Sequence, residues 1–142
     1  MIFLDTSSAI EILNGNYSLE NLITNFDGES FAITTPSIFE LYHGIYKLKF
    51  LKQKITQQKY DKLCKELEDF ITQLNVLSLD EQAANFAAKL HIQLKAKGQE
   101  IDVFDCLIAA IIITNDDNKI ITRFKFYDLV IFIDFIQFCF NK

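Results

Sequence analysis

The chain has 142 residues, half of them hydrophobic, with one proline, four glycines and a formal net charge of −5. This length suits a single domain spanning 1–142, and the composition supplies a sizeable core while excluding a long disordered linker. The acidic total gives no sign of nucleic-acid binding, although a total can hide a local basic patch.

The first half of the chain alternates short apolar strands with helices. The predicted elements are a buried strand at 1–5, short helices at 7–14 and 18–26, a strand at 30–34, and helices at 36–50 and 55–73. Gly15 is typical of the residue that follows a helix. Thr35 and Pro36 predict the N-cap and the first residue of the helix at 36–50.

The second half continues the alternation. The predicted elements are a strand at 75–79, a long helix at 80–97 ended by Gly98, a nearly all-apolar helix at 103–114, and strands at 119–123 and 129–133. This alternation predicts an α/β fold in which helices cover both faces of a parallel sheet. In such sheets the functional site lies beyond the carboxyl ends of the strands.

Neither a secretory leader nor a membrane span is predicted. No positive charge precedes the apolar residues at the start, Asp5 interrupts them, and later apolar runs are shorter than the roughly 18–20 residues of a spanning helix. The scattered cysteines, Cys64, Cys106 and Cys139, favour buried thiols in a reducing compartment over a disulfide framework or a zinc site. We therefore expect a cytoplasmic protein with no membrane partner.

Four acidic residues follow predicted strands or begin helices that pack against the sheet. Asp5 ends the first strand, Glu40 lies about one turn into the helix after the second strand, and Asp105 lies near the start of the apolar helix. Asp102 precedes Asp105 by three residues and shares its side of the helix if the first turn reaches back far enough. We expect these carboxylates to meet at the carboxyl edge of the sheet.

Each acid also has a purely structural interpretation. Asp5 and Asp102 suit the capping of the helices that follow them. Glu40 suits a solvated helix surface, and Asp105 suits the positive end of its helix dipole. Asp105 is the hardest to explain in this way, because the apolar residues around it leave that helix almost no wet face.

Several carboxylates at one edge repel one another, raise one another's pKa, and stay ionised only if a cation compensates them. Oxygen ligands without histidine or thiolate favour a hard ion, Mg²⁺ or Mn²⁺. Such an ion activates a water molecule and holds a scissile phosphate, which is the chemistry of metal-dependent phosphodiester hydrolysis.

The order of these motifs resembles the PIN domain, and within that superfamily it is similar to the VapC toxins of VapBC toxin–antitoxin pairs. The resemblance consists of a strand ending in Asp-Thr, a glutamate after the second strand, an Asp-x-Leu-Ile-Ala-Ala motif, and a late strand ending in Thr-Arg. The segments are MIFLDTSSAIEIL (1–13), TPSIFELYHG (35–44), GQEIDVFDCLIAA (98–110) and KIITR (119–123). Each motif alone is weak, but their order covers nearly the whole chain.

The resemblance implies a PIN-like three-layer α/β/α sandwich with a mainly parallel central sheet. It also implies a Mg²⁺- or Mn²⁺-dependent endoribonuclease that uses a metal-activated water. The family's catalytic metal-binding acids correspond to Asp5, Glu40 and Asp105. A further acid that helps to hold metal or water corresponds to Asp102, and the supporting hydroxyl positions correspond to Thr6 and Thr122.

The chain departs from the family pattern after the late strand. Members often have Asp or Asn directly after Thr-Arg, but this chain has Phe124 there, and Asp128 is the nearest following acid. Asp128 is a possible fourth acid if the loop bends to bring it in. The departure argues against a second metal ion. It also supports an alternative function, a degenerate PIN-like module that binds RNA or protein with little or no cleavage.

A basic strip lies at 47–65. It holds seven of the fourteen basic residues of the chain, one acid, Asp61, and interleaved aromatic residues. Such a strip suits an RNA backbone with unpaired bases, and it equally suits a solvated helical hairpin. The predicted RNA-binding residues are Lys47, Lys49 and Lys52 from this strip, and Arg123 after the late strand. His43 and His91 are not expected to bind metal.

The resemblance further implies a homodimer and a VapB-like antitoxin partner, whose tail lies in a groove and offers a basic side chain to the acids. Apolar surface on the helices at 36–50 and 55–73 suits both contacts.

Two other phosphate-handling folds are excluded. A response-regulator receiver needs an acidic pair after its first strand, and a DxDxT phosphatase needs a second aspartate there, whereas Asp5 precedes Thr6 and Ser7.

Overall fold

The computed structural model describes residues 1–142 apart from 17, 27–28, 100, 116–118, 123–124 and 129–142, and at 23, 119–122 and 125–128 it describes the backbone alone. In chain order the elements are β1 (Ile2–Leu4), α1 (Thr6–Leu13), α2 (Leu19–Asn25), β2 (Phe31–Thr34), α3 (Thr35–Tyr46), the π-helical turn η1 (Lys47–Leu51), α4 (Gln57–Ile71), β3 (Asn75–Leu77), α5 (Glu81–Ala96), α6 (Val103–Thr114), β4 (Lys119–Thr122) and β5 (Lys125–Asp128). None of the helices in the described part of the chain has the length and apolar character needed to cross a membrane.

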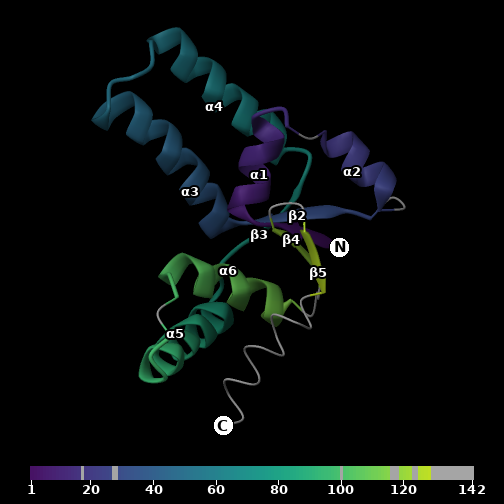
Figure 1. Ribbon diagram of the computed structural model, residues 1–142, viewed down its shortest axis with the longest axis vertical. Helices are drawn as coiled ribbons and strands as arrows, with labels where there is room; N and C mark the ends of the chain where they lie inside the picture. The colour runs from purple at the N-terminus through teal and green to yellow at the C-terminus, as the bar shows by residue number, and fades with distance from the viewer. Residues whose placement is uncertain (17, 27–28, 100, 116–118, 123–124, 129–142) are drawn as a thin grey trace.

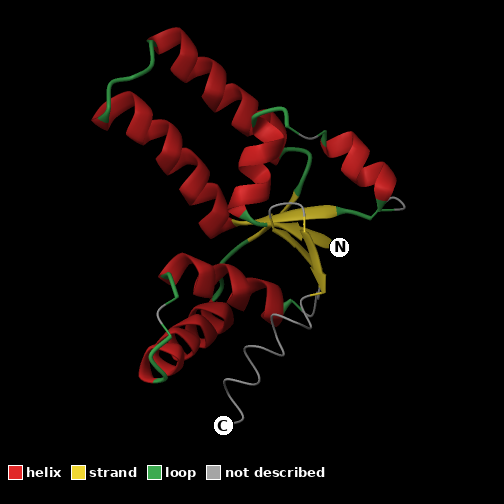
Figure 2. Ribbon diagram, in the orientation of Figure 1, coloured by secondary structure: helices red, strands yellow, loops and turns green. Residues whose placement is uncertain are grey.

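The strands form one sheet in the order β3-β2-β1-β4-β5. Neighbouring strands are parallel from β3 to β4, and β5 pairs with β4 in the antiparallel direction. Helices α1 to α4 lie on one side of this sheet, and α5 and α6 lie on the other (Figures 1 and 2). The predicted three-layer α/β/α sandwich with a mainly parallel sheet is therefore confirmed.

The two faces of the sheet build two parts of the core, because successive residues of a strand point to opposite faces. Ile2, Leu4 and Ile33 pack with residues of α1, α2, α3 and α4. Phe3 and Ala32 pack with Ile108 and Ile112 of α6 on the other face. All three residues of β1 are 1% exposed. Each such large side chain contributes roughly 1.5–3 kcal/mol through burial, so β1 is the central strand that the sequence predicts.

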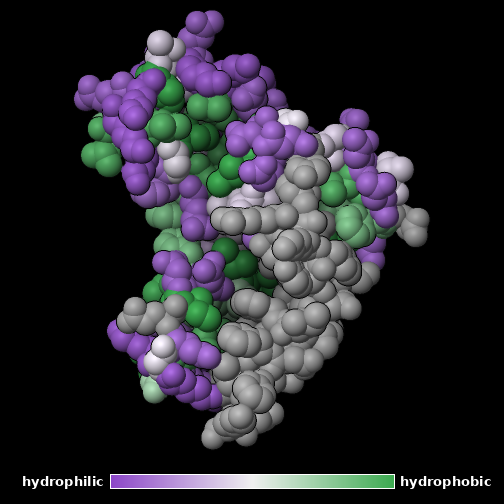
Figure 3. Space-filling model, in the orientation of Figure 1, coloured by the Kyte–Doolittle hydropathy of each residue, from purple (hydrophilic) through white to green (hydrophobic). Residues whose placement is uncertain are grey.

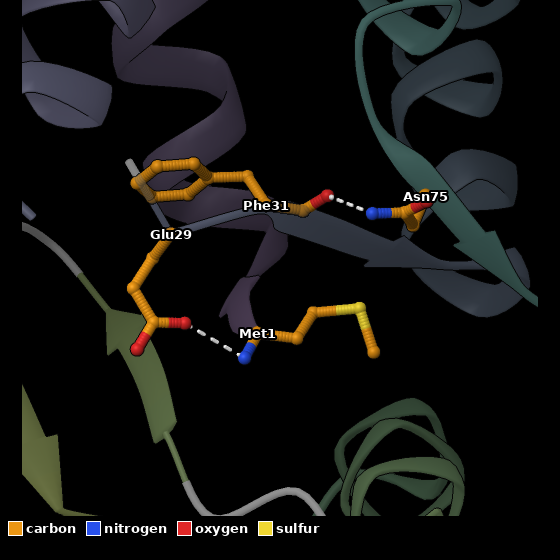
Figure 4. A network of polar contacts seen from close by, with 4 residues as sticks. All are labelled: Met1, Glu29, Phe31 and Asn75. Atoms are coloured by element: carbon orange, nitrogen blue, oxygen red, sulfur yellow. Dashed lines mark hydrogen bonds and ion pairs between the residues drawn. The ribbon is translucent and has the colours of Figure 1, made fainter. Parts of the chain in front are cut away.

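Polar contacts fix the start of the sheet (Figure 4). The Asn75 side-chain amide of β3 donates to the Phe31 carbonyl of β2 at 3.3 Å. The Met1 amino group donates to a carboxylate oxygen of Glu29 at 2.9 Å, and the Ile2 amide donates to the Ser30 carbonyl at 2.8 Å. These contacts hold β1 and β3 against β2, so the carboxyl ends of the three strands keep a fixed relation.

Most predicted elements are confirmed, with the helix at 103–114 found at its predicted bounds. The N-cap of α3 is Thr34 and not Thr35, because the buried Thr34 hydroxyl oxygen accepts from the Ser37 amide at 3.4 Å. The predicted helix at 36–50 is α3 followed by η1, where the Lys52 amide donates to the Lys47 carbonyl.

The C-terminal part of the sheet differs from the prediction. Strand β5 at Lys125–Asp128 was not predicted, since its four residues KFYD show no clear alternation and follow β4 after only two positions. The predicted strand at 129–133 lies outside the described residues. Strand β5 runs antiparallel to β4, with Thr122 paired with Lys125 and Lys119 paired with Asp128.

Candidate active site

The parallel strands bring their carboxyl ends to one edge of the sheet. Leu4, the last residue of β1, is paired with Ile121 of β4, so Asp5 and Thr122 follow at neighbouring positions. Thr34 ends β2 at the same edge, since β2 is the parallel neighbour of β1 on its other side. The predicted site residues Asp5 and Thr122 are therefore brought together by the backbone, although only the backbone of Thr122 is described.

Asp5 occupies the turn between β1 and α1 as the N-cap of α1. One of its carboxylate oxygens accepts from the Ser8 amide at 2.7 Å, and the other accepts from the Ser7 hydroxyl at 2.8 Å. These contacts explain how a buried strand ends on a charge, because the helix N-terminus stabilises the carboxylate. The capping interpretation of Asp5 is confirmed, and the half-buried carboxylate still lies at the sheet edge.

Glu40 reaches the same edge from α3. The hydroxyl of Thr6, the first residue of α1, donates to a carboxylate oxygen of Glu40. This hydrogen bond joins α1 to α3 across the loops that follow β1 and β2. Glu40 is half-buried, so it is not the freely solvated residue of the structural interpretation. Thr6, predicted as a supporting hydroxyl of the site, thus contacts one of the predicted acids.

Asp105 comes to the site on the first turn of α6. The ring of the preceding residue, Phe104, stacks on Phe39 of α3 with centroids 5.1 Å apart, and this contact places the start of α6 beside α3. Desolvation of the carboxyl group raises the pKa of Asp105 above its ordinary value, and the negative charges of Asp102, Glu40 and Asp5 raise this pKa further. The four predicted acids thus lie close enough to influence one another electrostatically.

We call Asp5, Glu40, Asp102 and Asp105 the carboxylate cluster. Asp102 is also the N-cap of α6, because its carboxylate accepts from the Phe104 amide at 2.8 Å, as the structural interpretation predicted. Within the described residues, no three His, Cys, Asp or Glu side chains converge closely enough to hold a metal ion. The oxygens of Asp5 and Glu40 face hydrogen-bond donors of the protein itself.

The chemistry of the carboxylate cluster nevertheless fits a hard divalent cation. All of its donors are oxygens, without thiolate or imidazole, which is the ligand set that Mg²⁺ and Mn²⁺ prefer. Burial raises the pKa of Asp105, and repulsion from the charges of Asp102, Glu40 and Asp5 raises it further. A cation between Asp105 and the other acids would relieve this repulsion.

The register of β5 places Asp128 away from this edge. Asp128 is paired with Lys119, whereas Thr122 is paired with Lys125. Three residues of a strand span about 10 Å, so the backbone of Asp128 lies at the opposite end of β4 from Thr122. This backbone register does not support the prediction of Asp128 as a fourth acid. Arg123 and Phe124 lie outside the described residues.

The predicted RNA-binding lysines lie along the hairpin of η1 and α4, at residues 47–65, which we call the lysine hairpin. Lys47 and Lys49 belong to η1, and Lys52 follows it. Lys49 lies over the ring of Tyr60, with its ammonium nitrogen 5.9 Å from the ring centroid. In the part of the chain that the structure describes, Lys47, Lys49 and Lys52 make no ion pair with an acid, whereas Lys62 and Lys65 pair with Glu66 and Asp69 at 3.5 and 3.8 Å.

Sequence reasoning missed several residues around the carboxylate cluster. Ser7 and Ser8 hold Asp5, and a signal for them existed, because small hydroxyl residues directly after a strand-ending aspartate suit the first turn of a helix. The stacking of Phe39 on Phe104 had no sequence signal, since it depends on how α3 and α6 meet. His91 is partly buried and, together with Asp102, lines a hollow of about 360 Å³.

Comparisons with known proteins agree with this architecture. The family model described as PIN domain matches residues 2–123. The chain is similar in structure to VapBC2 from Rickettsia felis bound to a promoter DNA fragment, with 22% identity, 86% of each chain covered and a TM-score of 0.69. It is also similar to VapBC-1 from nontypeable Haemophilus influenzae, with 21% identity, 87% of each chain covered and a TM-score of 0.67.

A third similar structure is FitAcB from Neisseria gonorrhoeae, with 24% identity, 87% of each chain covered and a TM-score of 0.61. A comparison with curated proteins found no match. At these identities the structural likeness speaks for the fold, while the family model covers most of the sequence, including the segments that contain Asp5, Glu40 and Asp105. The chain therefore belongs to the PIN domain family.

Proposed function

We propose that this chain is a VapC-like toxin, a Mg²⁺- or Mn²⁺-dependent endoribonuclease that hydrolyses RNA phosphodiester bonds in the cytoplasm. PIN domains are generally nucleases. The observation that carries the proposal is the placement of acids from distant segments near the carboxyl edge of a PIN fold: Asp5 follows β1 at this edge, and the hydroxyl of the next residue, Thr6, donates to Glu40 of α3. Desolvation and the charge of Asp102 raise the pKa of Asp105, and the charges of Glu40 and Asp5 raise it further, which supports the inclusion of Asp105.

Each residue of the carboxylate cluster has a defined role in this proposal. Asp5, Glu40 and Asp105 would hold the divalent cation, and Asp102 would support it. When bound, the cation supplies positive charge to the scissile phosphate and activates a water molecule. Ser7 and Ser8 orient the Asp5 carboxylate, and Thr6 orients Glu40, in the manner of outer-shell donors that fix ligand geometry. Thr122 follows at the neighbouring strand end.

The partners follow from the structural neighbours, several of which are VapBC complexes. We propose that a VapB-like antitoxin binds this chain and offers a basic side chain to the carboxylate cluster, where it would neutralise the same repulsion that a cation relieves. We also propose a homodimer. Lys47, Lys49 and Lys52, which have no acidic partner in the described residues, would contact the RNA backbone together with Arg123.

The test compares RNA cleavage by the native chain, by Asp5→Asn and by Glu81→Gln. Glu81 is an exposed acid on the first turn of α5, so its variant controls for the loss of one charge. We expect cleavage with Mn²⁺ or Mg²⁺ by the native chain and by Glu81→Gln, and none with EDTA or with Asp5→Asn. Cleavage that persists in EDTA or in Asp5→Asn would contradict the metal mechanism.

A second function is a PIN-like module that binds RNA or protein and cleaves little. The observation that favours it is the absence of three converging ligand side chains among the described residues. RNA binding by the native chain without cleavage of any RNA, at every divalent cation tried, would establish this second function in place of the first.

A further inference from the structure

Three near-parallel rings lie next to the carboxylate cluster. The ring of Phe39 is stacked with His43 of the same helix, with centroids 5.7 Å apart and planes 8° apart. It is also stacked with Phe104 of α6, with centroids 5.1 Å apart and planes 17° apart. Phe39 is nevertheless 55% exposed, and His43 is exposed. Part of this ring stack is thus open to solvent where α3 meets α6.

The position of these rings in the chain ties them to the carboxylate cluster. Phe39 directly precedes Glu40, and Phe104 directly precedes Asp105. The contact between Phe39 and Phe104 is the contact that brings Asp105 toward Glu40. Whatever stacks on these rings is therefore held beside the acids that would receive the scissile phosphate.

The ring surface continues along α3 toward the lysine hairpin. Four ring-bearing residues follow one another at spacings of four, three and four, which places them on one side of a helix. They are Phe39, His43, Tyr46 and Phe50. Tyr46 and Phe50 are 43% and 64% exposed, and their centroids are 6.1 Å apart. Figure 3 shows hydrophobic side chains exposed among hydrophilic ones over the α3–α4 end of the molecule. Lys47 and Lys49 lie in the same stretch.

We propose that Phe39, His43 and Phe104 form a stacking subsite for an unpaired nucleobase of the RNA, beside the bond to be cleaved. The proposal rests on the nuclease function above and adds the side chains that would hold a base of the substrate next to the cleaved bond. Alternating aromatic and basic side chains are the usual platform for single strands, because bases stack on the rings while lysines contact phosphates. A paired base is already stacked within its duplex and would have to leave it.

A second protein chain is the competing occupant, since exposed apolar side chains also mark protein interfaces. Two features favour the nucleobase. The rings are near-parallel, and lysines that have no acidic partner among the described residues follow directly after α3 in η1, which suits a polyanion. The test therefore includes the oligomeric state of each variant.

The experiment measures binding of a short unstructured oligoribonucleotide that carries 2-aminopurine, whose fluorescence is quenched when it stacks on an aromatic ring. Asp5→Asn is the background, so that the RNA stays intact. Phe39→Leu removes the ring and keeps the apolar character, Phe39→Tyr keeps the ring, and Ile92→Ala changes an apolar side chain on α5 that is 63% exposed. Sedimentation of each variant gives its oligomeric state.

We expect Phe39→Leu to weaken binding about tenfold or more and to abolish the quenching. Phe39→Tyr and Ile92→Ala should bind and quench as the background protein does. Binding of the same strand in a duplex should be weaker and insensitive to Phe39→Leu. These results, with an unchanged oligomeric state, support the subsite.

Other results overturn the subsite or separate it from the nuclease. If Phe39→Leu converts a dimer into a monomer and loses RNA binding with it, the rings belong to a protein interface. If Phe39→Leu binds RNA as the background protein does, and cleaves RNA normally when Asp5 is restored, the subsite is wrong and the nuclease stands. If the chain with Asp5 restored cleaves no RNA but binding still depends on the ring, the nuclease is wrong and the stacking site stands.

Discussion

The carboxylate cluster and the lysine hairpin are both charged, but the fold holds them in different ways. In the carboxylate cluster, Asp5 and Asp102 cap helices, and Thr6 ties Glu40 to α1. On the lysine hairpin, Lys62 and Lys65 make only exposed ion pairs within α4, and Lys47 and Lys52 make none in the described residues. The carboxylates of Asp5, Glu40 and Asp102 are fixed by backbone or hydroxyl donors, and Asp105 is held on the first turn of α6, whereas the lysine charges are at the ends of long side chains.

This difference predicts different consequences for substitution. Removing a fixed carboxylate changes the geometry and charge of a small site, so the effect on chemistry is large. Removing an exposed lysine removes one of several similar charges that salt already screens, so the effect on binding is small and depends on ionic strength. Four predictions test this contrast, from the largest effect to the smallest.

The largest effect is expected for Asp105→Asn. The change keeps the shape of the side chain and removes one negative ligand, so cleavage should fall by about 100- to 1,000-fold, in line with the several kcal/mol that a bound cation contributes to the transition state. Single-turnover cleavage of a fixed RNA at several Mn²⁺ concentrations measures the loss. A fall of less than about threefold would mean that Asp105 is not a ligand.

A smaller effect is expected for Thr6→Val, which removes the hydroxyl that donates to Glu40. Loss of an orienting donor typically costs about 10- to 100-fold in metal affinity or activity. Thr24→Val is the matched control, because the Thr24 hydroxyl donates to a backbone carbonyl on α2 at 2.9 Å and lies outside the site. Equal cleavage rates in the two variants would show that Thr6 has no role in orienting Glu40.

A weaker, salt-dependent effect is expected for the combined change of Lys47, Lys49 and Lys52 to Gln. RNA binding should weaken by several-fold at low salt, and the slope of log affinity against log salt should decrease by up to about 2, since each contact with single strands contributes about 0.7. Changing Lys62 and Lys65 to Gln is the control, because these lysines already have acidic partners. An unchanged slope in the triple variant would remove the three lysines from the interface.

The smallest effect is on stability without metal. Desolvation and the neighbouring acids raise the pKa of Asp105 in the folded chain. Its ionised form is therefore less favourable in the folded chain than in the unfolded one, and stability falls as pH rises from the ordinary aspartate pKa to the raised one. Asp105→Asn should stabilise the chain in EDTA at neutral pH by less than about 1 kcal/mol, because solvent screens the site.

Urea unfolding of the native chain and of Asp105→Asn at acidic and at neutral pH measures this effect. We expect the two proteins to differ only at the higher pH. A native chain that is more stable than the variant at neutral pH in EDTA would show that Asp105 has a stabilising partner, and the idea of uncompensated charge in the carboxylate cluster would be wrong.

Elements with a strong local pattern were predictable from the sequence. The apolar runs of β1 and α6, the positive φ of Gly15 and Gly98 after their helices, and the acid at the end of β1 all depend on nearby residues. Because parallel strands share one edge for their carboxyl ends, the meeting of Asp5 with Glu40 followed from the same pattern. Asp105 was also predicted from its local pattern, because a charge on an almost wholly apolar helix needs a partner, and the PIN resemblance then implied its role as a metal ligand.

Features that depend on distant contacts were not predictable. The N-cap of α3 is Thr34, one residue before the predicted Thr35, because Thr34 and Ser37 are buried together and hydrogen-bonded. The Thr35 hydroxyl oxygen instead accepts from the Leu79 amide at 3.1 Å. The place of Asp128 depends on the β4–β5 register, which four residues of weak pattern do not fix. The ring stack of Phe39 and Phe104 depends on how two helices meet.

The most direct measurement is an anomalous difference map from crystals of the native chain grown with Mn²⁺, at a concentration that supports RNA cleavage. We predict a peak about 2.1 Å from carboxylate oxygens of Asp5, Glu40 or Asp105, with at least two of these residues as ligands, and no such peak in crystals of Asp105→Asn. A map with no peak at the carboxylate cluster, from a protein that cleaves RNA in the same buffer, would contradict the central claim that these acids form one metal site.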